Sequence, residues 1–133
     1  LSEALTVTAG RILSTLPAAR LACVNVLKLN RVTIDTTLDK DHNNKHVDRL
    51  VKLRHWASML GLPQERVTTH VIEAVDPAAA LLEFAEVNKV DHIIIGARQE
   101  SLRRKFLGSV SAQVAAEARC SVTVVRPPNA REP

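Results

Sequence analysis

Aromatic side chains are scarce in this sequence of 133 residues, which contains one tryptophan, two phenylalanines and no tyrosine. Proteins that bind single-stranded nucleic acids stack bases on aromatic rings, so the scarcity argues against a nucleic-acid partner. The net charge is +4, but the cations are spread along the chain apart from one cluster at residues 103–105. This distribution indicates a solvated basic surface.

Cysteines and long apolar runs are also scarce. Cys23 and Cys120 are the two cysteines, and both fall in segments predicted as strands. This placement indicates small buried side chains and no disulfide framework. The longest apolar runs are far too short to cross a bilayer, and the first residues lack the pattern of a signal peptide. We therefore expect a cytoplasmic protein without a membrane partner.

Apolar residues make up 46% of the sequence, enough for the core of one domain built from Leu, Val, Ile and Ala. Hydrophobic periodicity predicts helices that alternate with strands. The alternation predicts an α/β fold, an open parallel sheet with helices on both faces. The expected helices are residues 2–16, 46–60, 77–88 and 108–118, and the expected strands are 21–29, 66–73, 92–96 and 121–126.

Local signals mark the ends of the second and third helices. Gly61 is expected to cap the second helix, and Asp76 to begin the third as its N-cap. Val47 and Val51 are assigned to the apolar face of the second helix. Residues 30–44, which precede this helix, are polar and irregular and are predicted as a loop.

The most informative stretch is residues 91–126. An apolar run of three isoleucines ends at Gly96, as a buried parallel strand does, and a polar loop that includes Arg98 follows. Gly108 and Ser109 then open an alanine-rich helix, and a valine-rich strand closes the unit. A helix that begins this way gathers unpaired N–H donors and the positive end of the helix dipole, an arrangement that binds phosphate.

At these residues the chain resembles the universal stress protein family. The family's nucleotide-binding signature, Gly-x2-Gly-x9-Gly-(Ser/Thr), follows a strand rich in Ile and Val. Gly96, Gly108 and Ser109 match its first and last elements. Gln99 stands in place of the second glycine, and the following loop is one residue shorter than in the signature.

The resemblance implies a Rossmann-like universal stress protein fold for residues 1–126, followed by a flexible tail at 127–133. The family's fold begins with a central strand, whereas this sequence starts directly in the first helix. The first central strand is therefore expected to be absent from residues 1–126. Buried backbone groups left unpaired cost about 1–3 kcal/mol each. We expect either that the sequence is a piece of a longer chain or that a partner strand fills the gap.

The resemblance further implies an adenine nucleotide, ATP or AMP, at the junction of strand 92–96 and helix 108–118. The N–H groups of Ser109 and Val110 would bind phosphate oxygens, with the serine hydroxyls assisting. The expected binding residues are Val26, Gly96, Ala97, Arg98, Gly108, Ser109, Val110 and Ser111. For single residues the alternatives are a turn glycine at Gly96, an ordinary helix cap at Ser109 and a core valine at Val26.

Signatures of catalysis are missing from the sequence. It contains no serine nucleophile elbow, no paired carboxylates of the glycosidase type and no Walker lysine. We expect at most slow, incidental ATP hydrolysis. His42 and His46 are one helical turn apart, but they lack a cysteine partner and are interpreted as structural or solvent-exposed. No protein metal site is expected, and Mg²⁺ would enter only with the nucleotide.

The strand at residues 121–126 would lie at a sheet edge. A bare edge of Val and Thr tends to pair with another chain, and family members commonly dimerise through this strand. We expect a homodimer with a role in stress response and signalling. The alternative is a dimerisation or regulatory module that binds no nucleotide and belongs to a larger protein such as a kinase or transporter. Its partner would then be a covalently linked or separate signalling protein.

Overall fold

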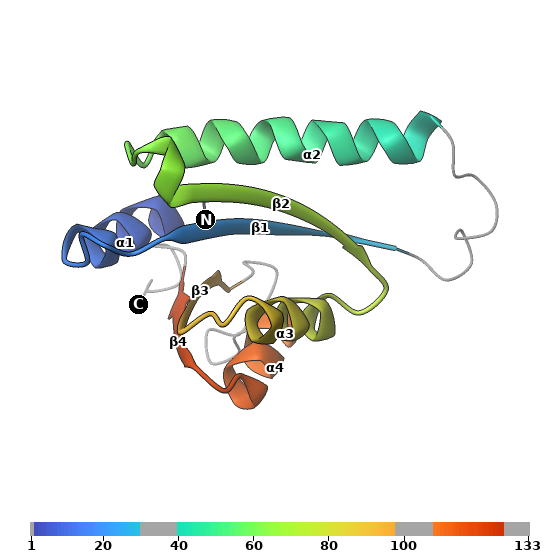
Figure 1. The fold of residues 1–133 in the computed structure, drawn as a ribbon. Helices are drawn as coiled ribbons and strands as arrows, with labels where there is room; N and C mark the ends of the chain where they lie inside the picture. The colour runs from blue at the N-terminus through green and yellow to red at the C-terminus, as the bar shows by residue number, and fades with distance from the viewer. Residues whose placement is uncertain (1, 30–39, 98–107, 127–133) are drawn as a thin grey trace, which may run out of the picture. The chain divides into compact units, whose positions relative to one another are not determined.

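The computed structural model describes residues 2–29, 40–97 and 108–126 of the chain. Within these ranges helices and strands alternate in chain order, and a short 3-10 turn, η1, precedes the second strand (Figure 1). The elements are α1 (Ser2–Ser14), β1 (Leu21–Lys28), α2 (Lys40–Ser58), η1 (Gln64–Arg66), β2 (Val67–Ala74), α3 (Pro77–Val87), β3 (His92–Gly96), α4 (Ser109–Glu117) and β4 (Ser121–Val125).

The alternation confirms the α/β prediction, and β3 has the bounds that the isoleucine run predicted. The helix ends were also recognisable. Gly61 has a φ of +67°, which glycine adopts readily, and the Ala79 N–H donates to the carboxylate of Asp76 at 3.2 Å. The expected tail at 127–133 lies outside the described residues.

The prediction for α2 was wrong at its beginning. The helix starts at Lys40, inside the segment that was expected to be a loop. Residues 40–45 contain no apolar side chain, so hydrophobic periodicity could not reveal this first turn and a half. They also contain no glycine or proline, so nothing in their backbone opposes a helix.

The predicted apolar face of α2 was also partly wrong. Val47 and Val51 are 57% and 59% exposed, whereas Ala57 is buried and Trp56 is half-buried. The buried side of the helix is therefore turned away from the two valines. Both are single apolar residues on a solvated surface, which is ordinary for globular proteins.

The described residues form two compact units. The α2 unit comprises Pro17–Ala80, and the α4 unit comprises Leu1–Leu16 and Leu81–Pro133. No helix in the described part of the chain is long and apolar enough to span a membrane.

In the α2 unit, β1 and β2 pair in parallel, from Leu21 opposite Val67 to Lys28 opposite Ala74. Helix α2 packs on both strands. Cys23 and Leu27 are buried and belong to the same sheet face as Asn25, because side chains alternate along a strand. Asn25 receives a hydrogen bond from Arg49 of α2, which identifies this face as the one that α2 covers.

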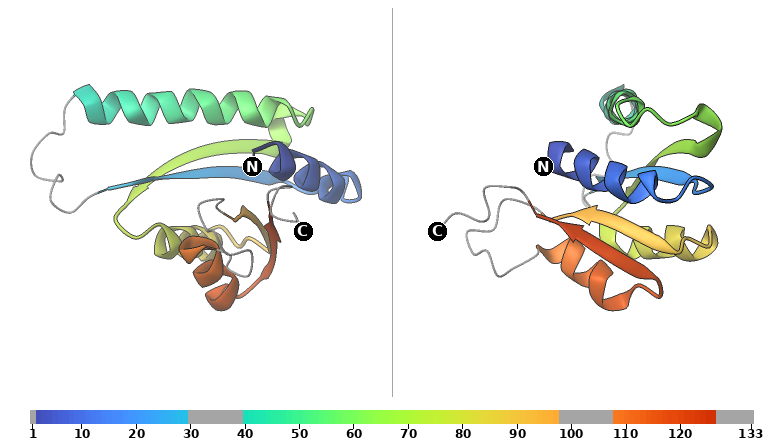
Figure 2. Two further views of the ribbon diagram at one scale, coloured as in Figure 1. Left: turned by 180° about the vertical axis from the view of Figure 1, so that it is seen from behind. Right: turned by 90° about the vertical axis from the view of Figure 1, so that its left-hand side faces the viewer.

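In the α4 unit, β3 and β4 pair in parallel, from His92 opposite Ser121 to Gly96 opposite Val125. Helices α1 and α4 lie on opposite faces of this sheet, as predicted for an open α/β sheet (Figure 2). The buried apolar side chains are aliphatic, as the composition predicted. They are Ala9, Leu13, Ala85, Ala97, Val114 and Val125.

The described strands form two separate ladders, β1–β2 and β3–β4, and no ladder joins them. The Ala97 N–H donates to the Val125 oxygen. The N–H and C=O groups of every second residue before Ala97, namely Ile95 and Ile93, therefore point toward β4. The N–H and C=O groups of Ile94 and Gly96 consequently point to the edge away from β4.

The end of α3 contains the one non-glycine residue with positive φ among the described residues, Lys89 at +54°. The Val90 N–H donates to the Ala85 oxygen at 2.9 Å, and the Lys89 N–H donates to the Glu86 oxygen at 3.3 Å. This pair of bonds is the Schellman motif, in which Lys89 occupies the position that glycine usually takes.

Lys89→Gly is therefore expected to raise the free energy of unfolding by about 0.5–1 kcal/mol, because glycine reaches this conformation without steric cost. Urea denaturation monitored by circular dichroism measures the change. Asn88→Gly, one residue earlier at a negative φ, is the matched control and should be neutral or destabilising. A destabilised Lys89→Gly variant would contradict the strain at this position.

Candidate functional site

The predicted binding corner in the α4 unit begins where β3 ends. Gly96 is the last residue of β3, and Ala97 extends the ladder by donating its N–H to the Val125 oxygen at 2.9 Å. Ala97 is buried, so its contribution to a ligand site would come from backbone rather than side chain. These residues lie at the carboxyl ends of parallel strands, where open α/β sheets bind ligands.

Helix α4 begins at Ser109, with Gly108 as its N-cap. Gly108 has φ +97° and ψ 155°, a conformation that disfavours any residue with a Cβ. No side chain caps the helix, and its first turn contains no acidic residue. The N–H groups of Ser109 and Val110 thus lie at the positive end of the helix dipole, and no carboxylate of the first turn competes with an anion for them.

The two serines of this helix turn have different environments. Ser109 is exposed, whereas Ser111 is 3% exposed and its hydroxyl donates to the Gly108 oxygen at 3.5 Å. The Ser111 hydroxyl is directed to the start of its own helix. Of the two side chains, Ser109 is therefore the one accessible to a ligand from solvent.

Arg98 and Val26 complete the set of predicted binding residues. Arg98 lies outside the described residues, together with Gln99 and the basic cluster at 103–105. Val26 belongs to the α2 unit, where it lies near the carboxyl end of β1 and is half-buried. Its backbone oxygen accepts a hydrogen bond from Arg49 at 3.3 Å.

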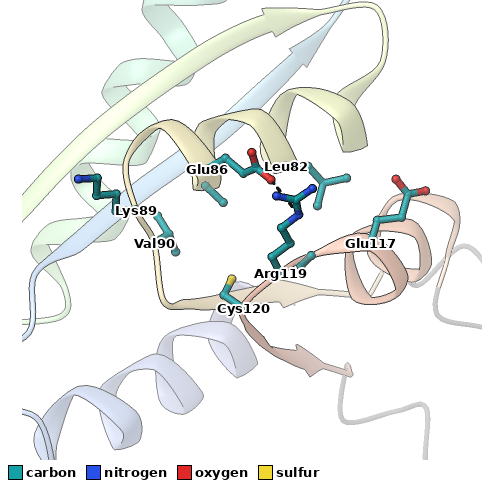
Figure 3. Close-up of a pocket in the computed structure, with 9 residues that line it drawn as sticks. Leu82, Glu86, Lys89, Val90, Glu117, Arg119 and Cys120 are labelled. Atoms are coloured by element: carbon teal, nitrogen blue, oxygen red, sulfur yellow. Dashed lines mark ion pairs between the residues drawn. The ribbon is translucent and has the colours of Figure 1, made fainter.

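A cavity of about 200 Å³ lies at a different place in the α4 unit (Figure 3). Val90 and Cys120, which line it, precede β3 and β4, so the cavity lies at the amino ends of the strands and the predicted corner at their carboxyl ends. Its rim includes an ion pair between Arg119 and Glu86 at 3.4 Å. The lining residues are Leu82, Ala85, Glu86, Lys89, Val90, Glu117, Ala118, Arg119 and Cys120.

The chemistry of this cavity favours no particular ligand. Two acidic and two basic side chains on the rim balance one another, and the Arg119–Glu86 pair is largely exposed, so it contributes little to stability or affinity. Sequence reasoning missed the cavity because its residues come from separate segments and share no motif.

The two cysteines have different environments. Cys23 is 5% exposed, and burial raises the pKa of its thiol from 9.0 to about 11. Its thiolate, the reactive form, is therefore rare at neutral pH. Cys120 precedes β4 and is half-buried, which corrects the prediction that it lies buried within a strand.

Among the described residues, no group of three or more His, Cys, Asp and Glu side chains is arranged to hold a metal ion. His46 contacts Glu73 of β2, with 2.7 Å between Nδ1 and Oε2. The side chain of His42, the other histidine of the pair noted in the sequence, lies outside the described residues.

Comparison with known proteins identifies the family. The model of the universal stress protein family matches residues 2–126. The chain belongs to the universal stress protein family. It is 37% identical over 82 residues to Universal stress protein MJ0531 of Methanocaldococcus jannaschii. That alignment covers 61% of this chain and 46% of the relative, so the match spans about half of the relative's length.

Several solved structures show the same fold. Hypothetical protein MJ0577 matches with a TM-score of 0.75 and 20% identity over 96% of this chain and 88% of its own. A universal stress protein in complex with cAMP matches with a TM-score of 0.66 and 21% identity, covering 94% of this chain and 86% of its own. A universal stress protein from Archaeoglobus fulgidus has a TM-score of 0.66 and 18% identity, over 93% and 82% of the two chains.

Proposed function

We propose that this universal stress protein domain binds an adenine nucleotide, ATP or AMP, and acts in cytoplasmic stress signalling. The observation that carries the proposal is the start of α4, where Gly108 is the N-cap, no side-chain cap bond is formed among the described residues, and the first turn of the helix contains no acidic residue. Helix starts of this kind bind phosphate. Membership of the family supports the proposal, and one structural relative is a complex with cAMP.

In this proposal the phosphates meet the N–H groups of Ser109 and Val110, and the Ser109 hydroxyl donates a further bond. Gly96 and Ala97 let the ligand approach the backbone at the end of β3. Arg98 would add a cation to the phosphates. Ser111 would act mainly by fixing the helix start, since its hydroxyl bonds to the Gly108 oxygen. Val26 is proposed to contact the adenine.

The alternative is a module that dimerises without a nucleotide and regulates a larger protein. It is favoured by β4, which pairs only with β3 among the described strands. This strand carries no charged residue and no proline that would discourage pairing with another chain. A second copy that pairs along β4 would produce a homodimer.

Titration of the purified protein with labelled ATP and AMP, with Mg²⁺ present, tests the two functions. We expect binding by the wild type and about 100-fold weaker binding by Gly108→Glu, whose carboxylate would occupy the phosphate position and repel the anion. Val87→Glu adds the same charge at a residue that is 71% exposed and should bind like the wild type.

Gly108→Ala is the matched control for backbone strain, because alanine meets the same positive φ without adding charge. Its affinity should lie between those of the wild type and Gly108→Glu, and circular dichroism verifies that each variant is folded. If the wild type fails to bind at millimolar nucleotide and light scattering gives the mass of a dimer, the alternative replaces the proposal. A monomer that binds no nucleotide would overturn both functions.

A further inference from the structure

The edge of β1 that faces away from β2 presents the backbone of Val26. At the opposite edge, the Leu29 N–H donates to the Ala74 oxygen of β2 at 2.8 Å. Successive residues of a strand direct their N–H and C=O groups to opposite edges. Those of Val26, three residues before Leu29, therefore point away from β2. Val26 is near the carboxyl end of β1, and ligands of open α/β sheets bind at this end of the strands.

Arg49 of α2 contacts this edge. Its Nη1 donates to Asn25 Oδ1 at 2.8 Å and to the Val26 oxygen at 3.3 Å, and both contacts are partly buried. Asn25 belongs to the sheet face that α2 covers, so the Arg49 side chain extends from the helix along this face to the edge at Val26. Two acceptors thus hold one end of the guanidinium beside the residue that is proposed to contact the base.

The guanidinium of Arg49 is not neutralised by a carboxylate among the described residues. Asp48, its neighbour on α2, pairs with Lys52 at 3.1 Å instead. The acceptors that Arg49 does contact are the neutral oxygens of Asn25 and Val26. The charge of the guanidinium is therefore available to acceptors of a ligand.

A guanidinium group distinguishes purines by the substituent at position 6. It has N–H donors on all of its nitrogens and no acceptor. A purine with an oxygen at position 6 presents two neighbouring acceptors, O6 and N7, to which arginine binds in a bidentate manner. Adenine has an amino group at position 6, so a donor of the base meets a donor of the side chain.

We infer that Arg49 is a specificity-determining residue of the nucleotide site and disfavours a 6-amino purine relative to a 6-oxo purine. The inference rests on the proposed function, because it requires the base to contact Val26. The guanidinium also bonds to the Val26 oxygen, the backbone acceptor at this edge that an adenine amino group would use. Adenine competes with Arg49 for this oxygen, whereas a 6-oxo purine accepts a hydrogen bond from the guanidinium where it stands.

Calorimetric titration of the purified protein with AMP and with IMP tests the inference. The two nucleotides share the ribose and the phosphate and differ at position 6 and in the proton on N1. In Arg49→Met, we expect the ratio of the AMP affinity to the IMP affinity to be about tenfold higher than in the wild type, because AMP gains and IMP loses when the donors are removed. A merely structural role of Arg49 would change both affinities alike and leave the ratio unchanged.

Further variants isolate the donor at this position. Arg49→Gln retains a donor for Asn25 and offers an acceptor to the adenine amino group, so it should raise the ratio as Arg49→Met does. Arg49→Lys retains a cationic donor and should keep the ratio within about threefold of the wild type. Arg54→Met is the matched control, since it removes a cation from an exposed position of the same helix and should leave the ratio unchanged.

The outcomes separate the inference from the proposed function. An unchanged ratio in both Arg49→Met and Arg49→Gln, with AMP and IMP bound, overturns the role of Arg49 and leaves the proposed function intact. Failure of the wild type and the variants to bind either nucleotide at millimolar concentration overturns the proposed function and the inference with it. Circular dichroism verifies that each protein is folded.

Discussion

Val114→Asp is expected to unfold the α4 unit under conditions in which the wild type is folded. Val114 has no solvent exposure and is the largest fully buried side chain among the described residues. An aspartate in this position would have to bury an unpaired carboxylate or take up a proton, at a cost of several kcal/mol. Typical domain stabilities are about 5–15 kcal/mol, and a sheet of two strands has little reserve.

Two further variants make the Val114 prediction quantitative. Val114→Ala removes buried methyl groups and is expected to lower the free energy of unfolding by about 2 kcal/mol. Val87→Asp introduces the same carboxylate at a residue that is 71% exposed and should change stability by no more than about 0.5 kcal/mol. Thermal denaturation by circular dichroism ranks the three variants. A Val114→Asp protein that melts like the wild type would contradict the position of Val114 in the core.

Cys23 is expected to react with a thiol reagent about 100-fold more slowly in the folded protein than in urea at pH 8. Burial raises the pKa of its thiol from 9.0 to about 11, a difference of two units, which lowers the thiolate fraction by about 100-fold. Ellman's reagent measures the rate in a Cys120→Ser variant, where Cys23 is the remaining cysteine. Cys23→Ser is the companion variant, and its half-buried Cys120 should react faster.

The same burial predicts how stability depends on alkaline pH. Since the folded state favours the neutral thiol, this contribution to stability is fully present below pH 9.0 and is lost as the pH rises through about 11. Urea midpoints of wild type and Cys23→Ala between these values test the sign, because the alanine variant should lose less stability. Equal labelling rates in native and urea-unfolded protein would show that Cys23 is accessible.

The sequence predicted some elements more accurately than others, and the difference follows from the local signals that each segment contains. Strand β3 was predicted to the residue because its isoleucine run is bounded by polar residues and a glycine. The start of α2 was missed because residues 40–45 have no apolar side chain, and burial of a helix face is the signal that periodicity detects. Val47 and Val51 fit helical spacing, but spacing alone does not fix which side of the helix the sheet covers.

For the candidate site, the sequence predicted that a helix starts at Gly108 but not the directions of its side chains. The motif makes Ser109 and Ser111 equivalent, whereas the tertiary structure leaves Ser109 exposed and buries Ser111. The contacts of Asn25 with Arg49 and of Glu73 with His46 join residues that are far apart in the sequence. No local sequence pattern predicts such pairs.

The sequence by itself determined the family, the alternation of helices and strands, and the aliphatic core. Each of these follows from local order: motif spacing, hydrophobic period and composition. Only the tertiary structure decided that the described strands form two ladders, that Ser109 is exposed while Ser111 is buried, and that His46 and Arg49 of α2 bond to residues of β1 and β2. These features depend on which distant backbone and side-chain groups come within hydrogen-bond distance, and that is set by packing between elements rather than within them.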